Sequence, residues 1–191
     1  MIFECALDGP DKRVCEHLAH LVNSDIVIDG VPLGNKRKLI ADCGRIAANL
    51  LATGCERVVV IWDLNPPWSN SARGCVAEDC RQIRESLTEA GVEIPAIHLV
   101  CIIQELEAWL LADERAVAEV LGLPSAKINR TKKPETIADP KAHLDTIFRT
   151  NKRPPYRAHM HAHKIAKAMK DLGRLKGCPA FARFERAVGK E

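Results

Sequence analysis

The stretch Arg57-Val58-Val59-Val60-Ile61-Trp62-Asp63-Leu64-Asn65 decides the fold class. Its run of Val and Ile is continuous and does not alternate with polar residues, which is typical of a parallel strand buried on both faces. The apolar run ends at the carboxylate of Asp63. Because open α/β sheets bind ligands in the crevice beyond the carboxyl ends of their strands, Asp63 is the first candidate for a site residue.

Strand-like and helix-like segments alternate around this run. The alternation predicts an α/β fold, with a mainly parallel central sheet of about four strands flanked by helices. Asp113 is the expected N-cap of a helix that ends at residue 121. Strands are expected at 3–7, 25–28, 57–63 and 94–103, and helices at 10–22, 36–53 and 75–90, the last two stopped by Gly54 and Gly91.

The N-terminal and C-terminal parts of the chain differ in charge. Residues 1–125 are expected to form the α/β core, and residues 126–191 a helical, basic C-terminal part packed on it, with helices at 140–150, 156–170 and 180–188. From Lys127 onward Lys and Arg outnumber Asp and Glu, although the formal net charge of the 191 residues is only +3. This asymmetry is compatible with a phosphate-rich partner and equally with a solvated helical surface.

Composition excludes several classes of protein. No apolar run approaches the roughly 20 residues that span a bilayer, and the first residues lack the pattern of a signal peptide, so a cytoplasmic protein without membrane contact is expected. The eight cysteines are scattered and contain no CxxC pair, which favours buried hydrophobes over disulfides or a metal site. The sequence has no Walker-type phosphate loop, GxSxG elbow or GxGxxG fingerprint.

Three acidic residues are expected to meet at the carboxyl edge of the sheet. Asp8 follows the first strand, Asp63 ends the third, and Glu107 lies just past the fourth. Mg²⁺ is usually held by one or two carboxylates together with water and substrate phosphate. The three residues therefore predict a site for Mg²⁺ or Mn²⁺. Helix capping by the same acidic residues is the alternative without a metal.

Four short motifs carry a resemblance to known proteins. Leu7-Asp8-Gly9-Pro10-Asp11 before a helix, and Ile61-Trp62-Asp63-Leu64-Asn65 on a later strand, resemble the Toprim (Rossmann-like) fold of topoisomerases, primases and related nucleases. Glu107-Ala108-Trp109-Leu110-Leu111-Ala112-Asp113 and Cys178-Pro179-Ala180-Phe181-Ala182-Arg183-Phe184 look like a small Toprim-like family of unassigned function. Members of that family occur beside ABC- or OLD-type ATPases in prokaryotic defence loci.

The resemblance implies an enzyme that depends on Mg²⁺ or Mn²⁺ and cleaves nucleic-acid phosphodiesters. Asp8, Asp63 and Glu107 would be its catalytic and metal-binding residues, and Asn65 a weaker oxygen ligand. Toprim proteins carry Glu-Gly after the first strand and Asp-x-Asp on the later one, so Asp8 and Asn65 depart from the pattern. The alternatives are a degenerate, non-catalytic domain that binds an ATPase or nucleic acid, and a small-molecule phosphotransfer or phosphatase domain.

Basic residues of the C-terminal part are candidates for contact with nucleic-acid phosphates. They are Lys132, Lys133, Arg157, His159, His163, Lys164 and Lys167. His159 and His163 share a helix face, so a metal site and a solvated face are further interpretations of this region. Trp109 and His98 are expected in the core, whereas Trp68 follows two prolines and is expected either to stack on a base or to anchor its loop.

Overall fold

The centre of the fold is a four-stranded sheet in the order β2-β1-β3-β4, in which every pair of neighbours is parallel. The computed structural model describes residues 1–67 and 74–190. The strands are β1 (Ile2–Phe3), β2 (Val31–Pro32), β3 (Val58–Asp63) and β4 (Ile97–Ile102). The predicted α/β class with a parallel four-stranded sheet is confirmed.

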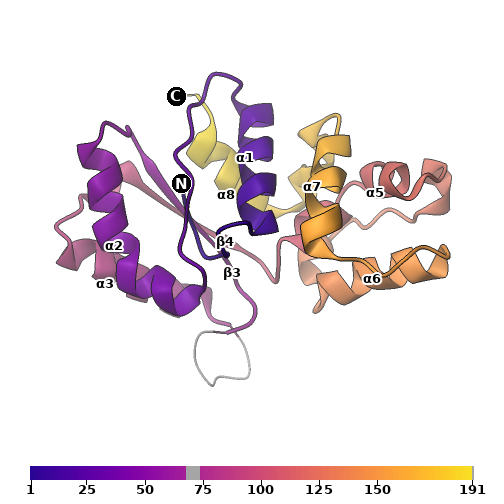
Figure 1. Cartoon of the computed structure of the whole chain (residues 1–191), viewed down its shortest axis with the longest axis horizontal. Coiled ribbons are helices and arrows are strands. Elements are labelled where there is room, and N and C mark those ends of the chain that lie inside the picture. The colour runs from indigo at the N-terminus through magenta and orange to yellow at the C-terminus, as the bar shows by residue number, and fades with distance from the viewer. Residues whose placement is uncertain (68–73, 191) are drawn as a thin grey trace.

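Helices cover both faces of this sheet (Figure 1). Val59 and Ile61 of β3 belong to the core under α1 and α8, whereas Val58, Val60 and Trp62 belong to the core under α2 and α3. A strand buried on both faces needs apolar residues at every position, which explains the continuous Val/Ile run. The covering helices are α1 (Pro10–Val22), α2 (Lys36–Ala52), α3 (Val76–Glu89) and α8 (Pro179–Val188).

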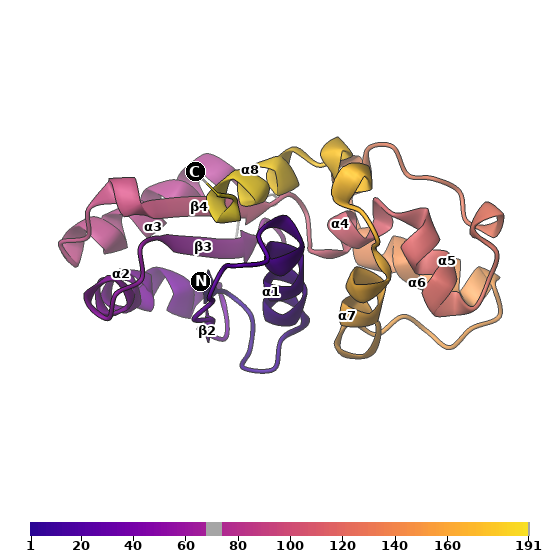
Figure 2. The same ribbon diagram turned by 90° about the horizontal axis from the view of Figure 1, so that it is seen from above.

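A lobe of four helices lies beyond the carboxyl ends of β3 and β4 (Figure 2). Its α7 packs against α1, and the core under α1 and α8 continues into the lobe. The lobe helices are α4 (Glu107–Leu111), α5 (Glu114–Leu121), α6 (Pro140–Thr150) and α7 (Ala158–Ala168). Short 3₁₀ turns cover Ile94–Ala96, Ser125–Lys127, Pro134–Thr136 and Leu172–Gly177.

The strand order creates a topological switch point between β1 and β3. The chain leaves β1 through α1 to β2 on one side, and leaves β3 through α3 to β4 on the other. In flavodoxin-like sheets with this order, the ligand crevice opens beyond the carboxyl ends of the two strands at the switch. The residues that follow β1 and end β3 are therefore the first place to look for a site.

Most of the predicted helices are confirmed. The helices expected at 10–22 and 140–150 have these bounds, and the other helices differ from the prediction by at most two residues at either end. Asp113 caps α5 by accepting hydrogen bonds from the backbone N–H groups of Arg115 at 3.1 Å and Ala116 at 3.4 Å. Of the eight free cysteines, four are buried as expected: Cys15, Cys43, Cys101 and Cys178.

Two strand predictions were wrong. The strand expected at 25–28 lies instead at Val31–Pro32, because backbone hydrogen bonds join Val31 to Met1 and Leu33 to Phe3, both at 2.8 Å. The first strand covers only Ile2–Phe3 and not residues 3–7, since the chain soon turns and the N–H of Gly9 donates to the Ala6 carbonyl at 2.8 Å. The first carboxylate beyond β1 is consequently Glu4 and not Asp8.

The single-residue predictions had mixed outcomes. Trp109 is fully buried against Phe181 and Phe184, as expected of a core residue. His98 is only half-buried, because β4 is an edge strand. Trp68 lies outside the described residues. None of the helices in the described ranges has the length and apolar character needed to cross a membrane.

Gly44 lies where α2 approaches α3 closely, and this generates a test of the packing. A Cβ at this position would lie 2.0 Å from the carbonyl oxygen of Ser86. Helix propensity alone predicts that Gly44→Ala stabilises α2 by about 1 kcal/mol. We expect instead that Gly44→Ala lowers the free energy of unfolding by about 1–3 kcal/mol in urea denaturation, because overpacking forces the helices apart.

The exposed Ala41→Gly variant measures the propensity contribution in the same helix and is expected to cost about 1 kcal/mol. A Gly44→Ala variant more stable than the wild type would contradict the close approach of α2 and α3.

Candidate functional site

A small cavity of about 50 Å³ opens at the switch point between β1 and β3. Its volume suits an ion or a few water molecules. Glu4, Cys5 and Asp11 line it from the β1 side, Ile61, Trp62 and Asp63 from β3, and Ile102 from β4. The crevice that the strand order predicts is therefore present, and three carboxyl groups line it.

Two further carboxyl groups, Glu105 and Glu107, act on the same centre from the chain beyond β4. Burial raises the pKa of Asp63 well above its ordinary value, and the charges of Asp11, Glu4, Glu107 and Glu105 raise it further. We call these five residues, with Asp63 at the centre, the acidic cluster. Their effect on Asp63 means that the cluster is one electrostatic unit, built from four segments of the chain.

Two members of the acidic cluster titrate near neutral pH. Burial raises the pKa of Glu4 to about 7, although the Lys36 charge and a hydrogen bond from the Asp63 backbone N–H to Glu4 Oε2, at 3.2 Å, lower it. Burial also raises the pKa of Glu107 to about 7. The hydroxyl of Tyr156 donates a hydrogen bond to Glu107 Oε1 at 3.1 Å. Burial raises the pKa of Asp11 and Glu105 as well.

Two oxygens of the acidic cluster lack a hydrogen-bond partner. Asp63 Oδ1 and Glu105 Oε2 are buried and unpartnered in the described part of the chain. Buried polar atoms are nearly always hydrogen-bonded, so such an atom requires an explanation. Carboxylate oxygens are the ligands that hard cations such as Mg²⁺ and Mn²⁺ prefer. The donor chemistry of the cluster therefore fits a hard divalent cation.

The carboxylates do not form a closed coordination shell. Across residues 1–67 and 74–190, no group of three or more His, Cys, Asp or Glu side chains is arranged to hold a metal ion. Mg²⁺ commonly needs only one or two protein carboxylates, because water and substrate phosphate complete its octahedron. The cluster thus fits an open site, in which Asp63 and one neighbour would hold the ion.

Two of the residues predicted from the sequence come together and two lie elsewhere. Asp63 and Glu107 both belong to the acidic cluster. Asp8 is exposed in the loop before α1. The side-chain amide of Asn65 donates to Gln104 Oε1, and its backbone N–H donates to the Gln104 carbonyl at 2.9 Å. Asn65 therefore links the chain after β3 to the chain after β4. The catalytic and metal-binding roles predicted for Asp8, Asp63, Asn65 and Glu107 stay predictions.

The sequence analysis missed Glu4, Asp11 and Glu105. Glu4 had a usable signal, because it follows the apolar pair Ile2-Phe3 directly, but the first strand was expected to continue to residue 7. Asp11 lies in the stretch Leu7-Asp8-Gly9-Pro10-Asp11, in which Asp8 alone was predicted as a site residue. The place of Glu105 depends on the path of the chain after β4, which sequence spacing does not define.

Lys36 is a buried cation beside the acidic cluster. Its Nζ donates hydrogen bonds to the carbonyl oxygens of Leu64, at 2.8 Å, and of Pro66. The ammonium group therefore fixes the chain that leaves β3, and its charge lowers the pKa of Glu4. Lys36 is the first residue of α2, so the start of this helix holds the backbone at Leu64 and Pro66 and offsets part of the negative charge.

Glu107 is positioned through its neighbour in the motif, Trp109. The Trp109 indole packs edge-on against Phe181 of α8, with ring centroids 5.2 Å apart, and donates to Glu135 Oε1 at 3.4 Å. Glu135 Oε1 also accepts a hydrogen bond at 3.1 Å from the backbone N–H of Ala180 in α8. Trp109 thereby anchors α4, which begins at Glu107, to α8.

The predicted nucleic-acid contacts lie on two parts of the lobe. Lys132 and Lys133 are exposed in the loop before the Pro134–Thr136 turn. Arg157 precedes α7, and that helix exposes His159, Lys164 and Lys167. His163 is only half-buried, but its ring contacts His17 of α1 edge-on, with centroids 5.9 Å apart, so it also joins α1 to α7.

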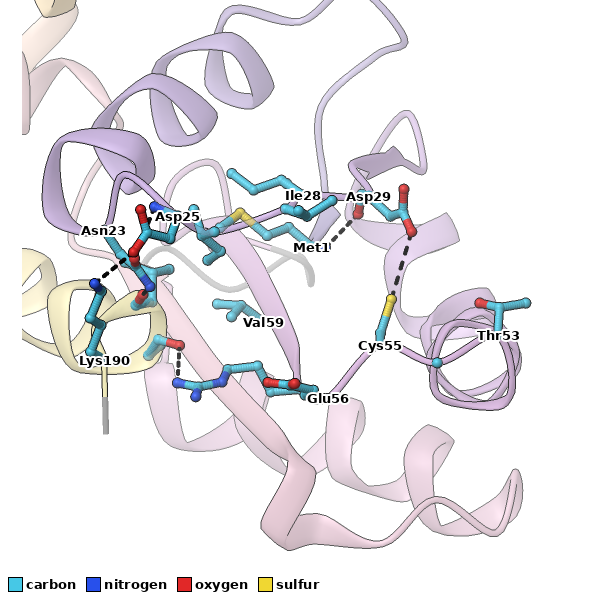
Figure 3. A pocket seen from close by; sticks show the side chains of 16 residues that line it. Met1, Asn23, Asp25, Ile28, Asp29, Thr53, Cys55, Glu56, Val59 and Lys190 are labelled. Atoms are coloured by element: carbon cyan, nitrogen blue, oxygen red, sulfur yellow. Dashed lines mark hydrogen bonds and ion pairs between the residues drawn. The ribbon is translucent and has the colours of Figure 1, made fainter.

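A larger cavity of about 450 Å³ lies away from the acidic cluster, between the chain before β1 and β3, the loop after α1 and the end of α8 (Figure 3). Its polar groups already bind each other. The Met1 amino group donates to the Asp29 carbonyl at 2.6 Å, Cys55 contacts the Asp29 carboxylate, and Lys190 pairs with Asp25 at 2.7 Å. Because parallel sheets bind ligands at the carboxyl edge, the acidic cluster is the better candidate despite its smaller cavity.

Comparison with known proteins identifies a family but no activity. Residues 12–189 match the protein family described as Domain of unknown function (DUF4276). No curated protein and no solved structure gives a significant match. The family match covers Asp63, Glu105 and Glu107, the lobe and α8, and it begins just after Glu4 and Asp11.

The raised pKa values predict how stability depends on pH. Between the ordinary pKa of 4.5 and about 7, Glu4 and Glu107 hold more protons in the folded chain than in the unfolded chain. Their contribution to the free energy of unfolding is therefore present below that window and is lost as the pH rises through it. Asp63 acts in the same direction, because its pKa is also raised.

We expect Asp63→Asn to relieve this cost, since it removes the central charge. The free energy of unfolding at pH 8 should rise by about 1–3 kcal/mol, given about 1.4 kcal/mol per pKa unit, with a smaller rise at pH 5. Urea denaturation at both pH values measures the difference. The exposed Glu93→Gln variant is the matched loss of one charge and should change stability by less than about 0.5 kcal/mol. Equal responses of the two variants would show that the cluster carries no such cost.

Proposed function

We propose that this chain, which belongs to the DUF4276 family, is an enzyme that depends on Mg²⁺ or Mn²⁺ and hydrolyses nucleic-acid phosphodiesters. The observation that carries the proposal is the buried, unpartnered Oδ1 of Asp63 at the switch point of the sheet. The four other carboxyl groups of the acidic cluster support it, because a divalent cation would neutralise their repulsion.

Asp63 would hold the cation together with Glu4 or Glu107. The bound ion supplies Lewis-acid polarisation of a phosphoryl oxygen and an activated water. Glu107 is suited to move a proton during hydrolysis, because its pKa of about 7 lies near neutral pH. The Tyr156 hydroxyl orients the Glu107 carboxylate, and Lys36 keeps the backbone beyond Asp63 in place.

The Toprim resemblance supports the same chemistry. Its pattern places Glu-Gly after the first strand, where the sequence predicted Asp8; Glu4 lies directly after β1 and is followed by Cys5 in place of Gly. Asp63 corresponds to the first acid of Asp-x-Asp at the end of β3, and Asn65 to the second. An ABC- or OLD-type ATPase as a partner rests on this resemblance alone.

A non-catalytic role is the second candidate, and two observations favour it. The Asn65 amide is bound to Gln104, and no group of three ligands is assembled anywhere in the described ranges. In this case the chain binds an ATPase or nucleic acid without cleaving a bond.

The cation is tested first, by thermal unfolding with and without Mn²⁺. An ion that binds only the folded state stabilises it, by about 2.7 kcal/mol at a concentration 100 times its Kd. For a chain of this size each kcal/mol raises the Tm by about 2–4 °C. We expect Mn²⁺ to raise the Tm of the wild type and of Glu93→Gln by several degrees, and to leave Asp63→Asn unchanged. A wild type that does not respond to Mn²⁺ would remove the basis of the enzymatic proposal.

Cleavage is tested on labelled single-stranded and double-stranded DNA and RNA with Mg²⁺ or Mn²⁺. We expect Asp63→Asn to lower the rate by at least about 100-fold while retaining its fold, because it removes the charge that binds the ion. Glu93→Gln, purified in the same way, controls for contaminating nucleases and should cleave at the rate of the wild type. Mn²⁺ binding without cleavage would favour the non-catalytic candidate, and equal cleavage by both variants would exclude Asp63 from the reaction.

A further inference from the structure

A third cavity, of about 440 Å³, lies in the helical lobe between α6 and the chain before α7. We call it the lobe cavity. Its lining is Asp139, Lys141, Ala142, Asp145, Arg149, Pro155, Tyr156 and Arg157. Three cations and two acids therefore surround a space large enough for a phosphate group.

Two side chains connect the lobe cavity to the acidic cluster. Tyr156 lines the cavity and donates its hydroxyl hydrogen bond to Glu107 Oε1 at 3.1 Å. Lys141 lines the same cavity, and its charge lowers the pKa of Glu107, Glu105 and Asp11. One end of the lobe cavity is thus a single side chain away from the proposed cation site.

The charge that remains available in the lobe cavity is positive. Asp139 is occupied as the N-cap of α6, where it accepts from the backbone N–H of Ala142 at 2.8 Å. Asp145 pairs with Arg149 at 2.5 Å and accepts from the backbone N–H of Tyr156 at 2.8 Å. Lys141 and Arg157 are exposed, and neither forms an ion pair with any residue that the structure describes. Both acids therefore have close partners, whereas the charges of Lys141 and Arg157 act on nearby acids, Glu107 and Asp145, without a direct ion pair among the described residues.

We propose that the lobe cavity binds a phosphate group of the nucleic-acid strand, through Lys141 and Arg157, next to the phosphodiester that faces the acidic cluster. This inference rests on the proposed function and gives the path of the substrate. Lys contacts phosphate as a point charge and Arg can contact it through two N–H groups. The strand then runs from the crevice at Asp63 past Tyr156 into the lobe.

Binding is measured apart from cleavage, by fluorescence anisotropy of a labelled single-stranded oligonucleotide in EDTA. We expect the Lys141→Ala/Arg157→Ala double variant to raise the Kd at least about 10-fold. The slope of log K against log salt should become shallower by about 0.7, since the cavity holds one phosphate and each neutralised phosphate of a single strand contributes about 0.7. Arg45→Ala/Lys170→Ala removes the same two residue types from exposed positions outside the lobe cavity and should keep both values. Thermal unfolding confirms that both double variants fold.

The outcomes separate this inference from the proposed function. An unchanged Kd and slope in Lys141→Ala/Arg157→Ala would overturn the inference. A wild type that binds no oligonucleotide would also overturn it. Neither outcome affects the cation and cleavage tests of the proposed function. The expected loss of binding, combined with a wild type that neither responds to Mn²⁺ nor cleaves, would retain the phosphate site and overturn the enzyme. Competition by inorganic phosphate, repeated with oligonucleotides of different lengths, distinguishes two kinds of site. At a site for free phosphate, oligonucleotide length has no effect on the Kd. At a site for a strand, longer oligonucleotides bind more tightly.

Discussion

The burial of β3 on both faces is the constraint on which the rest of the structure depends. Alternate residues of β3 enter two different hydrophobic cores, so the sheet must be covered by helices on each side. Parallel strands joined by helical crossovers meet this requirement. The strand ends where its chain leaves both cores, and Asp63 lies at that point. Its carboxylate is consequently removed from water, into surroundings where an unpaired charge is unfavourable.

The acidic cluster concentrates this unfavourable electrostatic free energy at one edge of the sheet. Burial and mutual repulsion raise the pKa of its members, and the protein offsets only part of the cost through Lys36, Lys141 and the Tyr156 hydroxyl. Lys36 Nζ donates to two backbone carbonyls beyond β3, and these hydrogen bonds hold its charge in place. Natural proteins tolerate such conflicts mainly at functional sites, where a ligand removes them. This argument distinguishes the crevice from the larger cavity in Figure 3, whose polar groups satisfy each other.

Much of the fold could be predicted because its signals are local. Helix periodicity and the caps at Asp113, Gly54 and Gly91 define element ends within a few residues of sequence. The short strands β1 and β2 have two residues each, too few for a pattern, and only pairing across the sheet identifies them. That error moved the expected site residue from Glu4 to Asp8. Lys141 and Tyr156 could not be found from spacing, since the lobe brings them to Glu107 from 34 and 49 residues away along the chain.

The Glu-Ala-Trp motif and the C-terminal motif, which lie far apart in the sequence, pack together as one unit. Trp109 packs between Phe181 and Phe184, and Glu135 binds both the Trp109 indole and the start of α8. These contacts attach α4 to a helix that covers the sheet, so Glu107 cannot shift without disturbing the core under α1 and α8. The lobe is therefore part of the candidate site, because it contributes Glu107 and the contacts that hold Glu107 in place. The sheet supplies Asp63, and the lobe supplies Glu107 together with Tyr156 and Lys141, which act on it.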